Sequence, residues 1–422
     1  MKKIGVALLG LGNIGSGVMK VLQENGELIK CREGMEIEVK RILVRNLKKK
    51  RSVEVDPALL TDDFNQIIND GSIDIIAEFM GGEMPAFTYI SEALKRGKSV
   101  ITANKEVIAK HWDELEEEAK RSGAGLYFEA SVAGGIPIIK PLRRSLQANR
   151  ILTLMGIING TTNFILTRMS EEGRTFEDVL SEAQRRGYAE PDPTADIEGY
   201  DARYKLSILS TLCFRNRVRV DNIYCEGIRG VAADDIKYAK ELGFGIKLLA
   251  IAKKLNGKIE ARVHPTFIPL SHPLYAVRDS YNAIFIKGDM VGDIMFYGRG
   301  AGDLPTASAI VSDIVTAGQN NGAHHSFRLE VEKPEIEDNW IDEYYMRLVV
   351  LDKPGVLAEI AGIFGRHNVS LDTVMQKQRD HDHATIIFIT HEAREKWIHE
   401  ALEEIKRSPA VISVESLIRV ER

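Results

Sequence analysis

The sequence predicts an α/β protein that opens with a doubly wound parallel sheet and ends with a smaller βαββαβ domain. Three observations support this fold class. Short apolar segments alternate with helical stretches over residues 1–130, as in a parallel sheet whose strands are connected by helices. A second block of alternating strands and helices follows an acidic stretch at 330–343. The length of 422 residues suggests two or three domains rather than one core.

The composition is typical of a soluble, folded protein. Charged residues make up 28% and hydrophobic residues 44% of the chain, which excludes collagen-like, disordered and disulfide-scaffold proteins. The net charge of −5 leaves no basic excess for nucleic acid. The longest apolar stretch, 151–158, is far shorter than the roughly 20 residues that span a bilayer. Three scattered cysteines indicate neither a disulfide framework nor a zinc site. We therefore expect a cytoplasmic protein that binds neither nucleic acid nor a membrane.

The first predicted element is a buried strand over 3–9, followed at once by a glycine-rich turn and a helix. Its glycines meet the needs of a dinucleotide site: a tight turn, room for a pyrophosphate against the backbone, and close packing of helix on sheet. The helix N-terminus offers N–H groups and partial positive charge to phosphates. A purely structural glycine turn is the alternative. The residues expected to bind the dinucleotide are Gly10, Gly12, Asn13, Ile14 and Gly15.

A second strand is predicted over 38–44, and the residues after it indicate which dinucleotide fits. An NAD-binding protein would place an acidic residue there for the ribose 2′-hydroxyl, whereas this chain has Arg45 and then a basic run. Cations suit the additional phosphate of NADP. We therefore expect NADP(H) to be preferred, with NAD(H) as a second cofactor. Arg45 is the stronger candidate, and Lys48–Lys50 are either phosphate contacts or an ordinary solvated loop.

The parallel pattern continues with strands predicted over 73–79 and 99–102 and helices predicted over 86–96 and 112–122. Ligands of such sheets bind outside the carboxyl ends of the strands. Thr102 and Lys105 lie at such an end and are therefore expected beside the cofactor. A lysine gains nothing from the positive end of a helix dipole, which is an argument for a functional Lys105. Taken alone, the position fits an ordinary surface lysine better.

Two polar turns follow in the middle region. The stretch 129–137 is a glycine-rich turn whose carbonyl oxygens could coordinate a hard cation, or a plain turn between domains. The stretch 159–163, Asn-Gly-Thr-Thr-Asn, gathers hydrogen-bonding groups ahead of a helix, and capping alone could explain it.

The stretch 187–205 is the most informative part of the chain. It contains two prolines and several acids and so predicts a stiff, anionic loop, after which a helix begins near Gly199. Asp201 and Lys205 are four residues apart, on one face of that helix. Taken alone they are an ordinary helix pair, worth about 0.3–0.5 kcal/mol.

These motifs occur in the order and spacing of homoserine dehydrogenases, and the chain resembles that family over about residues 3–320. The resemblance includes the stretch 298–307, ahead of a small-residue helix that runs to about residue 317. It implies a Rossmann-like NADP-binding domain over 1–130, completed by residues 303–320, and an α+β catalytic and dimerisation domain over 131–302. Gly302 then lies at the start of the helix that closes the nucleotide cleft.

The same resemblance implies the reversible NAD(P)-dependent reduction of L-aspartate 4-semialdehyde to L-homoserine, a step toward threonine, isoleucine and methionine. By similarity, Lys205 donates the proton in reduction, and Lys105 lies beside substrate and nicotinamide and polarises the carbonyl. Glu190 and Asp201 match positions that hold the substrate's amino group, and Asp196 fits the same acidic pattern. The family also binds structural sodium through main-chain oxygens, for which side-chain identity matters little, at positions that match Glu129, Val132, Gly134 and Ile136.

The tail is predicted to be a separate domain after a solvated acidic linker at 330–343, which contains Glu332 and Asp342. Its strands and helices are expected over 345–351, 356–367, 369–376, 384–390, 393–407 and 411–420. This βαββαβ order and the turn at 352–357 resemble a ferredoxin-like ACT domain over 344–422. Such modules pair with a copy of themselves and bind amino acids, which makes threonine the expected effector.

By similarity, the polar groups of the effector would be met at Gly355 and Asn368. A turn glycine and a helix-ending asparagine are the alternatives. The middle domain and the tail are both expected to self-associate, so we expect a homo-oligomer, either a dimer or a tetramer.

Two other interpretations have less support. The histidines at 264, 272, 324, 325, 381 and 383 lack the spacing of a zinc motif, and surface histidines explain them better. A non-catalytic NADP and amino-acid sensor would share the cofactor fold and the tail, but would not need Asp201 and Lys205 beside Glu190. The presence of that set favours an NADP-preferring oxidoreductase that acts on a CH–OH group.

Overall fold

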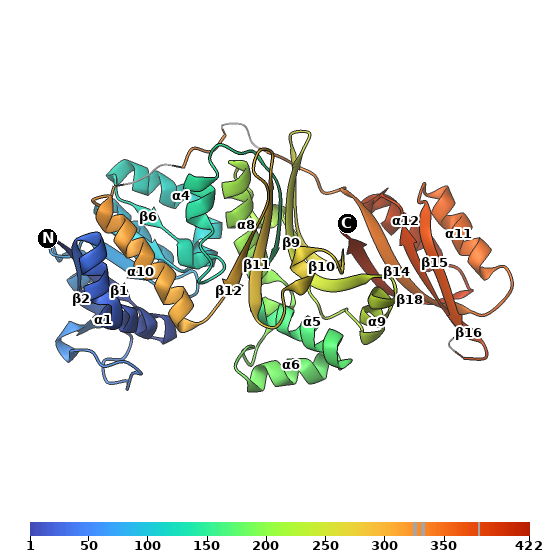
Figure 1. The fold of residues 1–422 in the computed structure, drawn as a ribbon, viewed down its shortest axis with the longest axis horizontal. Helices are drawn as coiled ribbons and strands as arrows, with labels where there is room; N and C mark the ends of the chain where they lie inside the picture. Colours follow the sequence, from blue (N-terminus) through green and yellow to red (C-terminus); the bar gives the residue numbers. More distant parts are fainter. Residues whose placement is uncertain (324–326, 331–333, 379) are drawn as a thin grey trace. The chain divides into compact units, whose positions relative to one another are not determined.

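The chain divides into two compact units in a computed structural model that describes residues 1–323, 327–330, 334–378 and 380–422 (Figure 1). The first unit contains Met1–Leu154, Tyr204–Asn222 and Asn282–Pro334, and the second contains Met155–Arg203, Ile223–Tyr281 and Glu335–Arg422. In the described part of the chain, no helix is both long enough and apolar enough to cross a membrane.

The first unit is built on a six-stranded sheet with the strand order β3-β2-β1-β4-β5-β6. Its strands are β1 Lys2–Leu9, β2 Met35–Leu43, β3 Leu60–Thr61, β4 Ile75–Glu78, β5 Ser99–Thr102 and β6 Leu126–Tyr127. All neighbouring strands along this order are parallel. The order reverses between β1 and β4, and dinucleotides bind at such a reversal. The predicted Rossmann-like, doubly wound sheet is therefore confirmed.

Helices cover this sheet. They are α1 Asn13–Glu33, α2 Asn65–Ile68, α3 Ala86–Lys95, α4 Lys105–Ser122 and α10 Asp303–Gln319, together with the single turn Pro57–Leu59. Val6 of β1 and Val18 of α1 share one core with Ile310 of α10. α10 lies against α1 (Figure 1), and a Cβ on Gly17 would be only 2.8 Å from the carbonyl oxygen of Asp303. The segment after Gly302 thus completes the core of the first sheet.

α4 begins at Lys105, earlier than the residue 112 that the sequence pattern indicates. The Asn104 side chain caps the helix by accepting a hydrogen bond from the Val107 N–H. The backbone of His111 is not helical (φ −110°, ψ 23°), so two helical segments meet there at a kink. Three consecutive residues of the first segment, 107–109, are buried, so its sequence lacks the one-sided apolar pattern that indicates an amphipathic helix.

The first unit contains further elements between and after these helices. They are the short helices Glu129–Ser131, Pro141–Ser145 and Val220–Asn222, most of α8 Tyr200–Phe214, and β12 Gly292–Arg299. The strands β7 Ile151–Ile157 and β11 Tyr281–Gly288 contain points where the chain passes from one unit to the other.

The second unit joins part of the middle region to the tail. Its middle-region elements are α5 Gly160–Glu172, α6 Phe176–Arg185, α7 Thr194–Ile197, β8 Tyr224–Cys225, α9 Ala233–Glu241, β9 Phe244–Leu255, β10 Lys258–Pro269 and the turn Pro273–Ala276. β9 and β10 form a long antiparallel hairpin whose turn residues, Asn256 and Gly257, both have positive φ (50° and 82°). β10 also pairs in parallel with β18 of the tail.

The tail has the predicted βαββαβ order. Its elements are β13 Glu335–Ile336, β14 Ile341–Leu351, α11 Val356–Arg366, β15 Leu371–Gln378, β16 His383–Thr390, β17 Ala393–Arg394, α12 Glu395–Ile405 and β18 Val411–Val420. Ile360 of α11 and Ile398 of α12 share one core with Leu348 and Phe388 of the sheet. The predicted ferredoxin-like fold of the tail is therefore confirmed.

The acidic stretch differs from the predicted solvated linker. β13 pairs with β10, and β14 already begins at Ile341. Asp342 is only 6% exposed, and its carboxylate lies 2.7 Å from Nη2 of Arg262. At the C-terminal end of the acidic stretch, Asp342 therefore neutralises a buried arginine that is distant in sequence. The charge pattern of the stretch alone cannot reveal such a partner. Glu332 lies outside the described residues. The division into three domains with the stated boundaries stays a prediction.

Candidate functional site

Three glycines in the first turn have three different physical roles. Gly10 has a φ of 114°, a conformation that residues with a side chain rarely adopt. A Cβ on Gly12 would meet no described atom within 4 Å, so the backbone there is open to a ligand. A Cβ on Gly15 would lie 2.4 Å from the Gly10 carbonyl oxygen, so only glycine lets α1 start this close to the turn. These are the roles that a dinucleotide fingerprint requires.

The N-terminus of α1 also suits a pyrophosphate. Gly12 occupies the N-cap position, and no side chain of the described residues caps the helix there. The N–H groups of the first turn and the helix dipole together form the kind of site that binds phosphate. Asn13 is exposed and Ile14 is half-buried beside this turn. The residues present therefore fit the dinucleotide that the sequence predicts.

Arg45 lies just beyond the end of β2, and its side chain is exposed. The Gly10 N–H donates to the Leu43 carbonyl oxygen at 3.0 Å, which places the end of β2 directly beside the glycine turn. The loop after Arg45 is shaped by Arg51, whose guanidinium donates to the carbonyl oxygens of Asn46 and Lys49, both at 2.7 Å. Arg51 therefore holds the loop, and Arg45 is the first cation after the strand end.

Glu78, at the end of β4, is a site residue that the sequence reasoning missed. It is fully buried, and its carboxylate accepts hydrogen bonds from Thr102 Oγ1 at 2.6 Å and from the Met80 N–H at 2.7 Å. Burial raises the pKa of this carboxyl group. Thr102 Oγ1 in turn accepts from the Asn104 N–H at 2.9 Å. These bonds hold the turn that presents Lys105 at the carboxyl edge of the sheet.

Lys105 and Lys205 both belong to the first unit. Lys105 is the first residue of α4, Lys205 lies in the second turn of α8, and both are half-buried. The ammonium of Lys110 lies 5.8 Å from the centre of the Tyr204 ring. Since Tyr204 precedes Lys205 and Lys110 follows Lys105 by little more than one turn, the N-terminal parts of the two helices are neighbours. The two predicted catalytic lysines therefore lie in the same region of this unit.

Asp196 and Asp201 are brought together by Asn159 in the second unit. Asn159 Nδ2 donates to Asp196 Oδ1 at 2.6 Å and to Asp201 Oδ2 at 2.9 Å. Asn159 and Asp201 are 5% and 7% exposed, so these bonds are shielded from water. Glu190 is exposed, and its main-chain carbonyl oxygen accepts a hydrogen bond from Gln184 at 3.2 Å. The structure thus joins Asp196 and Asp201, and the place of Glu190 beside them stays a prediction.

Asn159 caps a helix, as its position suggests, and also donates hydrogen bonds to two aspartates. Its Oδ1 accepts a hydrogen bond from the Thr162 N–H at 2.9 Å and so caps α5. Ser, Thr or Asp would cap as well, but only asparagine also has two side-chain N–H groups to donate to carboxylates. The asparagine at an N-cap, upstream of an acidic loop, was the signal available in the sequence.

The acidic loop is held in place by the segment after β8. The Ile228 N–H donates to the Ile197 carbonyl oxygen at 2.8 Å. A Cβ on Gly227 would lie 2.1 Å from that same oxygen, so the two backbones touch directly. Cys225 Sγ also approaches the Glu198 carbonyl oxygen at 3.3 Å. The main chain of Gly227 and Ile228 therefore supports the loop that carries Asp196 and leads to Asp201.

The turn expected to bind sodium contains a buried carboxylate with a role of its own. Glu129 is 3% exposed, and its oxygens accept hydrogen bonds from the N–H groups of residues 138–140 at 2.6, 2.7 and 2.8 Å. These bonds hold the backbone just before the short helix Pro141–Ser145. Ala133 and Gly134 both have positive φ (56° and 53°), which reverses the chain. The Glu129 side chain therefore holds the turn, and the binding of sodium by main-chain oxygens stays a prediction.

Gly355 and Asn368 both occupy special backbone positions at the ends of α11. Gly355 is the N-cap residue with a φ of 93°, and Asn368 follows the helix with a φ of 58°. Both residues are exposed. Glycine and asparagine are the residues that tolerate such angles best, so the backbone by itself explains both. Their contact with an effector stays a prediction.

The expectation that the histidines lie at the surface is wrong for His264. This residue is fully buried on β10, and its Nδ1 lies 2.9 Å from the Pro265 carbonyl oxygen. Burial lowers its pKa, so it is a neutral core residue. β10 is buried on both faces, so a polar residue within it cannot avoid the core. His324 and His325 lie outside the described residues. Elsewhere, no group of three His, Cys, Asp or Glu side chains in the described chain could hold a metal ion.

Comparison with known proteins identifies the family. A family model described as Homoserine dehydrogenase matches residues 137–315, and one described as Homoserine dehydrogenase, NAD binding domain, matches residues 10–129. An ACT domain model matches residues 344–410.

Whole-chain relatives agree with these matches. A homoserine dehydrogenase of Corynebacterium glutamicum is 44% identical over 428 residues, which cover 99% of this chain and 96% of that protein. One of Synechocystis is 45% identical over 437 residues and 99% of each chain.

Solved structures agree as well. The crystal structure of a homoserine dehydrogenase from Thiobacillus denitrificans has a TM-score of 0.94 at 44% identity and covers 100% of this chain and 99% of that one. A hyperthermophilic archaeal homoserine dehydrogenase in complex with NADPH has a TM-score of 0.65 at 29% identity and covers 78% of this chain and 100% of that one. This chain therefore belongs to the homoserine dehydrogenase family and carries an ACT domain.

Proposed function

We propose that this protein is an oxidoreductase that reversibly reduces L-aspartate 4-semialdehyde to L-homoserine with NAD(P)H, in the biosynthesis of threonine, isoleucine and methionine. The observation that carries the proposal is the pair Asp196 and Asp201, joined through Asn159 at the start of the helix that contains Lys205. Membership of the family over the whole chain supports it further.

The reaction requires a proton donor at the carbonyl oxygen. When bound, the nicotinamide supplies a hydride for the aldehyde carbon. The Lys205 ammonium delivers a proton to the oxygen that becomes negative, and its amine takes the proton back in the reverse direction. Lys105 polarises the same carbonyl with its positive charge. A general acid of this kind contributes about 100- to 10,000-fold to the rate.

The acidic loop suits the ammonium group of the substrate. Asp196 and Asp201, with Glu190 as a third acid, offer charge-assisted hydrogen bonds to a cation. Asn159 fixes one oxygen of each aspartate, so the second oxygen of each has a defined direction. Pairs of carboxylates also repel each other unless a cation lies between them, which favours an amine-bearing substrate over a neutral aldehyde.

The cofactor is proposed to be NADP(H) in preference to NAD(H). The glycine turn and the first turn of α1 hold the pyrophosphate, and Arg45 holds the 2′-phosphate with two N–H groups of its guanidinium. Thr102, Lys105 and Gly302, the N-cap residue of α10 with a φ of 119°, line the nicotinamide side of the cleft.

A structural sodium ion is proposed in the turn after β6, held by main-chain oxygens of Glu129, Val132, Gly134 and Ile136. Two hydrogen bonds inside the turn support this set. The Ser131 and Ile136 N–H groups donate to the carbonyl oxygens of Phe128 and Ala133 at 3.0 and 2.9 Å, and neither carbonyl belongs to the proposed set. Replacing sodium chloride by choline chloride is expected to lower the Tm of the protein.

Threonine is proposed as the effector of the ACT domain, at Gly355 and Asn368, in a homo-oligomer formed by the middle region and the tail. A ligand that prefers one state of the enzyme shifts both its activity and its stability. Millimolar threonine should therefore change turnover and raise the Tm. An absence of both effects would exclude threonine as the ligand.

The proposed function is tested by following NADPH oxidation with L-aspartate 4-semialdehyde and with a panel of other small aldehydes and keto acids. Turnover of the semialdehyde well above the panel supports the proposal. Turnover of other substrates but not of this one would redirect the assignment to another reductase. Tight NADPH and threonine binding without turnover of any compound would favour the non-catalytic sensor.

A further inference from the structure

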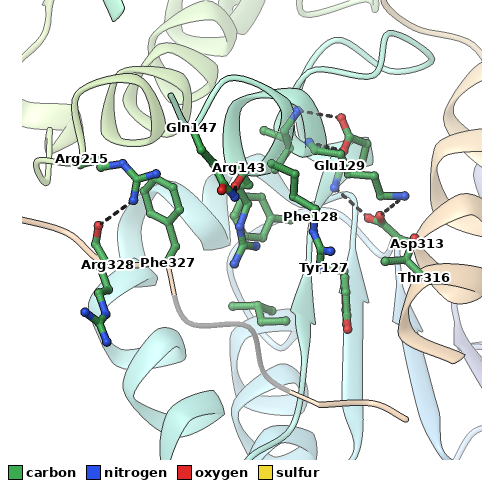
Figure 2. A pocket seen from close by; sticks show the side chains of 14 residues that line it. Tyr127, Phe128, Glu129, Arg143, Gln147, Arg215, Asp313, Thr316, Phe327 and Arg328 are labelled. Atoms are coloured by element: carbon green, nitrogen blue, oxygen red, sulfur yellow. Dashed lines mark hydrogen bonds and ion pairs between the residues drawn. The ribbon is translucent and has the colours of Figure 1, made fainter. Parts of the chain in front are cut away.

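The first unit contains a cavity of about 710 Å³ outside the proposed catalytic residues (Figure 2). It lies between β6, the segment at 139–147, the C-terminal end of α8 and the middle of α10. Of the residues proposed to bind substrate, cofactor or sodium, only Glu129 lines it. A volume of this size is within the range of about 300–1,000 Å³ in which small molecules bind.

The cavity lining carries an excess of positive charge. Five cationic residues line it, against the two acids Glu129 and Asp313; the cationic residues are Lys140, Arg143, Arg144, Arg215 and Arg328. Both acids are already neutralised within the structure. The carboxylate of Glu129 accepts three backbone N–H groups, and Asp313 accepts the Glu129 N–H at 2.9 Å and pairs with Lys140 at 3.0 Å. The other cations of the lining are Arg144, Arg215 and Arg328, together with Arg143, which lies near the carboxyl group of Glu116.

Aromatic rings hold two of these arginines in place. The guanidinium of Arg215 lies 4.8 Å from the centre of the Phe327 ring, and that of Arg143 lies 5.7 Å from the same ring and 5.9 Å from the ring of Phe128. A guanidinium that stacks by its face keeps its N–H groups at the edge, where they can donate in plane. Figure 2 shows Arg215 and Arg328 at one end of the cavity and Asp313 at the other, so the charges are separated in space.

Two guanidinium groups stacked on one ring repel each other. Nearby Glu116 offsets part of the charge of Arg143, and Arg215 donates a long bond of 3.5 Å to the Arg328 carbonyl oxygen. An anion with a single charge would leave part of this repulsion in place. A bound oxyanion with two or more charges would relieve it, and planar N–H pairs match the oxygens of carboxylates and phosphates.

We propose that this cavity binds a multivalent oxyanion, an organic phosphate or polycarboxylate, through Arg143 and Arg215, with Arg144 and Arg328 at its rim. The ligand site is distinct from the glycine turn that holds the dinucleotide. The inference concerns binding alone and does not depend on the proposed reaction.

The test is calorimetric titration of the full-length protein with inorganic pyrophosphate and with citrate, in sodium chloride of matched ionic strength. Each titration is carried out with and without saturating NADP⁺, because the glycine turn also binds phosphate. The variant Arg215→Gln should weaken binding at least ten-fold, and Arg143→Gln should do the same. The matched control is Arg150→Gln, whose side chain is 89% exposed and outside the cavity lining, and it should bind as the parent protein does.

The outcomes separate the alternatives. Binding that persists with NADP⁺ and is lost in Arg215→Gln supports the proposal, and the tighter of the two anions identifies the ligand class. Binding that NADP⁺ abolishes and Arg215→Gln leaves unchanged belongs to the glycine turn and overturns the proposal, as does an absence of binding by both anions. If Arg143→Gln fails to fold, the titration of Arg215→Gln still shows whether the cavity binds the anion. An unchanged Tm confirms that Arg215→Gln is folded.

Discussion

The most telling residue outside the candidate site is Glu116 of α4. The residue as a whole is half-buried and its carboxyl oxygen Oε1 is buried. Burial raises the pKa of Glu116 to about 7, while the charge of Arg143 opposes the rise. In the unfolded chain a glutamate titrates near 4.5. The folded state therefore keeps its proton longer than the unfolded state, so this group's contribution to stability is full below pH 4.5 and is lost as the pH rises through 7.

Replacing Glu116 by glutamine should remove this pH dependence, because glutamine resembles the protonated acid at every pH. We expect the free energy of unfolding of the variant to equal that of the parent near pH 4.5 and to exceed it by about 2 kcal/mol at pH 8. This value is reduced for solvent screening, because Glu116 is only half-buried. Urea titrations at both pH values measure the difference. An equal difference at the two pH values would show that Glu116 does not titrate in this range.

Lys205 is the residue on which the proposed chemistry depends. The variant Lys205→Ala removes the proton donor, so we expect kcat to fall by about 100- to 10,000-fold. The Kd for NADPH, measured by fluorescence, should stay nearly the same, because the proposed cofactor site is the glycine turn. Lys237→Ala, an exposed lysine on helix α9, is the control and should keep full activity. Near-normal reduction of the semialdehyde by Lys205→Ala would refute the assigned role.

Arg45 is the residue on which the proposed preference for NADP(H) depends. Hydrogen bonds to charged groups are worth about 1.5–3 kcal/mol, so Arg45→Ala should weaken NADPH binding by about 10- to 100-fold and leave NADH binding nearly unchanged. Lys49→Ala, in the exposed loop nearby, tests the alternative that this loop is merely solvated, and it should change neither Kd. An equal loss for both cofactors in Arg45→Ala would mean that this residue does not contact the 2′-phosphate.

At the scale of secondary structure, the predictions succeeded where the pattern is local. β5 occupies the predicted residues because a short buried run lies between polar segments, and α8 starts next to Gly199, whose φ of 83° ends the preceding turn. They failed where a partner distant in sequence decides. Nothing local to Asn159 shows that it donates to Asp196, and nothing local to Asp342 shows that Arg262 neutralises it.

The contact between Gly227 and the acidic loop is the element-scale feature most open to test. A Cβ at residue 227 would lie 2.1 Å from the Ile197 carbonyl oxygen and 2.5 Å from the Glu198 Cα, and backbone atoms cannot move aside independently. We expect Gly227→Ala to lower the free energy of unfolding by about 1–3 kcal/mol and, through displacement of Asp196 and Asp201, to raise KM for the semialdehyde more than it lowers kcat. Thermal unfolding and steady-state kinetics measure both effects.

Gly230→Ala is the matched control for this substitution. It lies three residues further along the same segment, and a Cβ there would meet no described atom within 4 Å. Its stability and KM should equal those of the parent protein. If Gly227→Ala also left KM unchanged while lowering stability, the segment after β8 would support the fold without positioning the acids.

At the scale of the whole chain, buried charges join the tail to the middle region within the second unit. Arg419 of β18 pairs with Glu226, the residue before Gly227, and with Glu395 of α12. Arg262 of β10 is fully buried and lies 2.6 Å from the carboxylate of Glu421. The tail therefore contacts, through Glu226, the same segment that supports the acidic loop. This gives a direct physical route by which a ligand on the tail could alter the proposed substrate site.

The strength of this connection can be measured at Arg262. Removing one partner of a buried ion pair leaves an uncompensated charge, so Arg262→Met should lower the free energy of unfolding by about 3–5 kcal/mol. Asp342 lies 2.7 Å from the same guanidinium, so adding Asp342→Asn to that variant should restore part of the loss. Lys258→Met, on the same strand, breaks an ion pair whose side chains are 41% and 68% exposed and should cost less than about 1 kcal/mol. Equal losses for Arg262→Met and Lys258→Met in urea unfolding would mean that the buried cluster does not hold the tail in place.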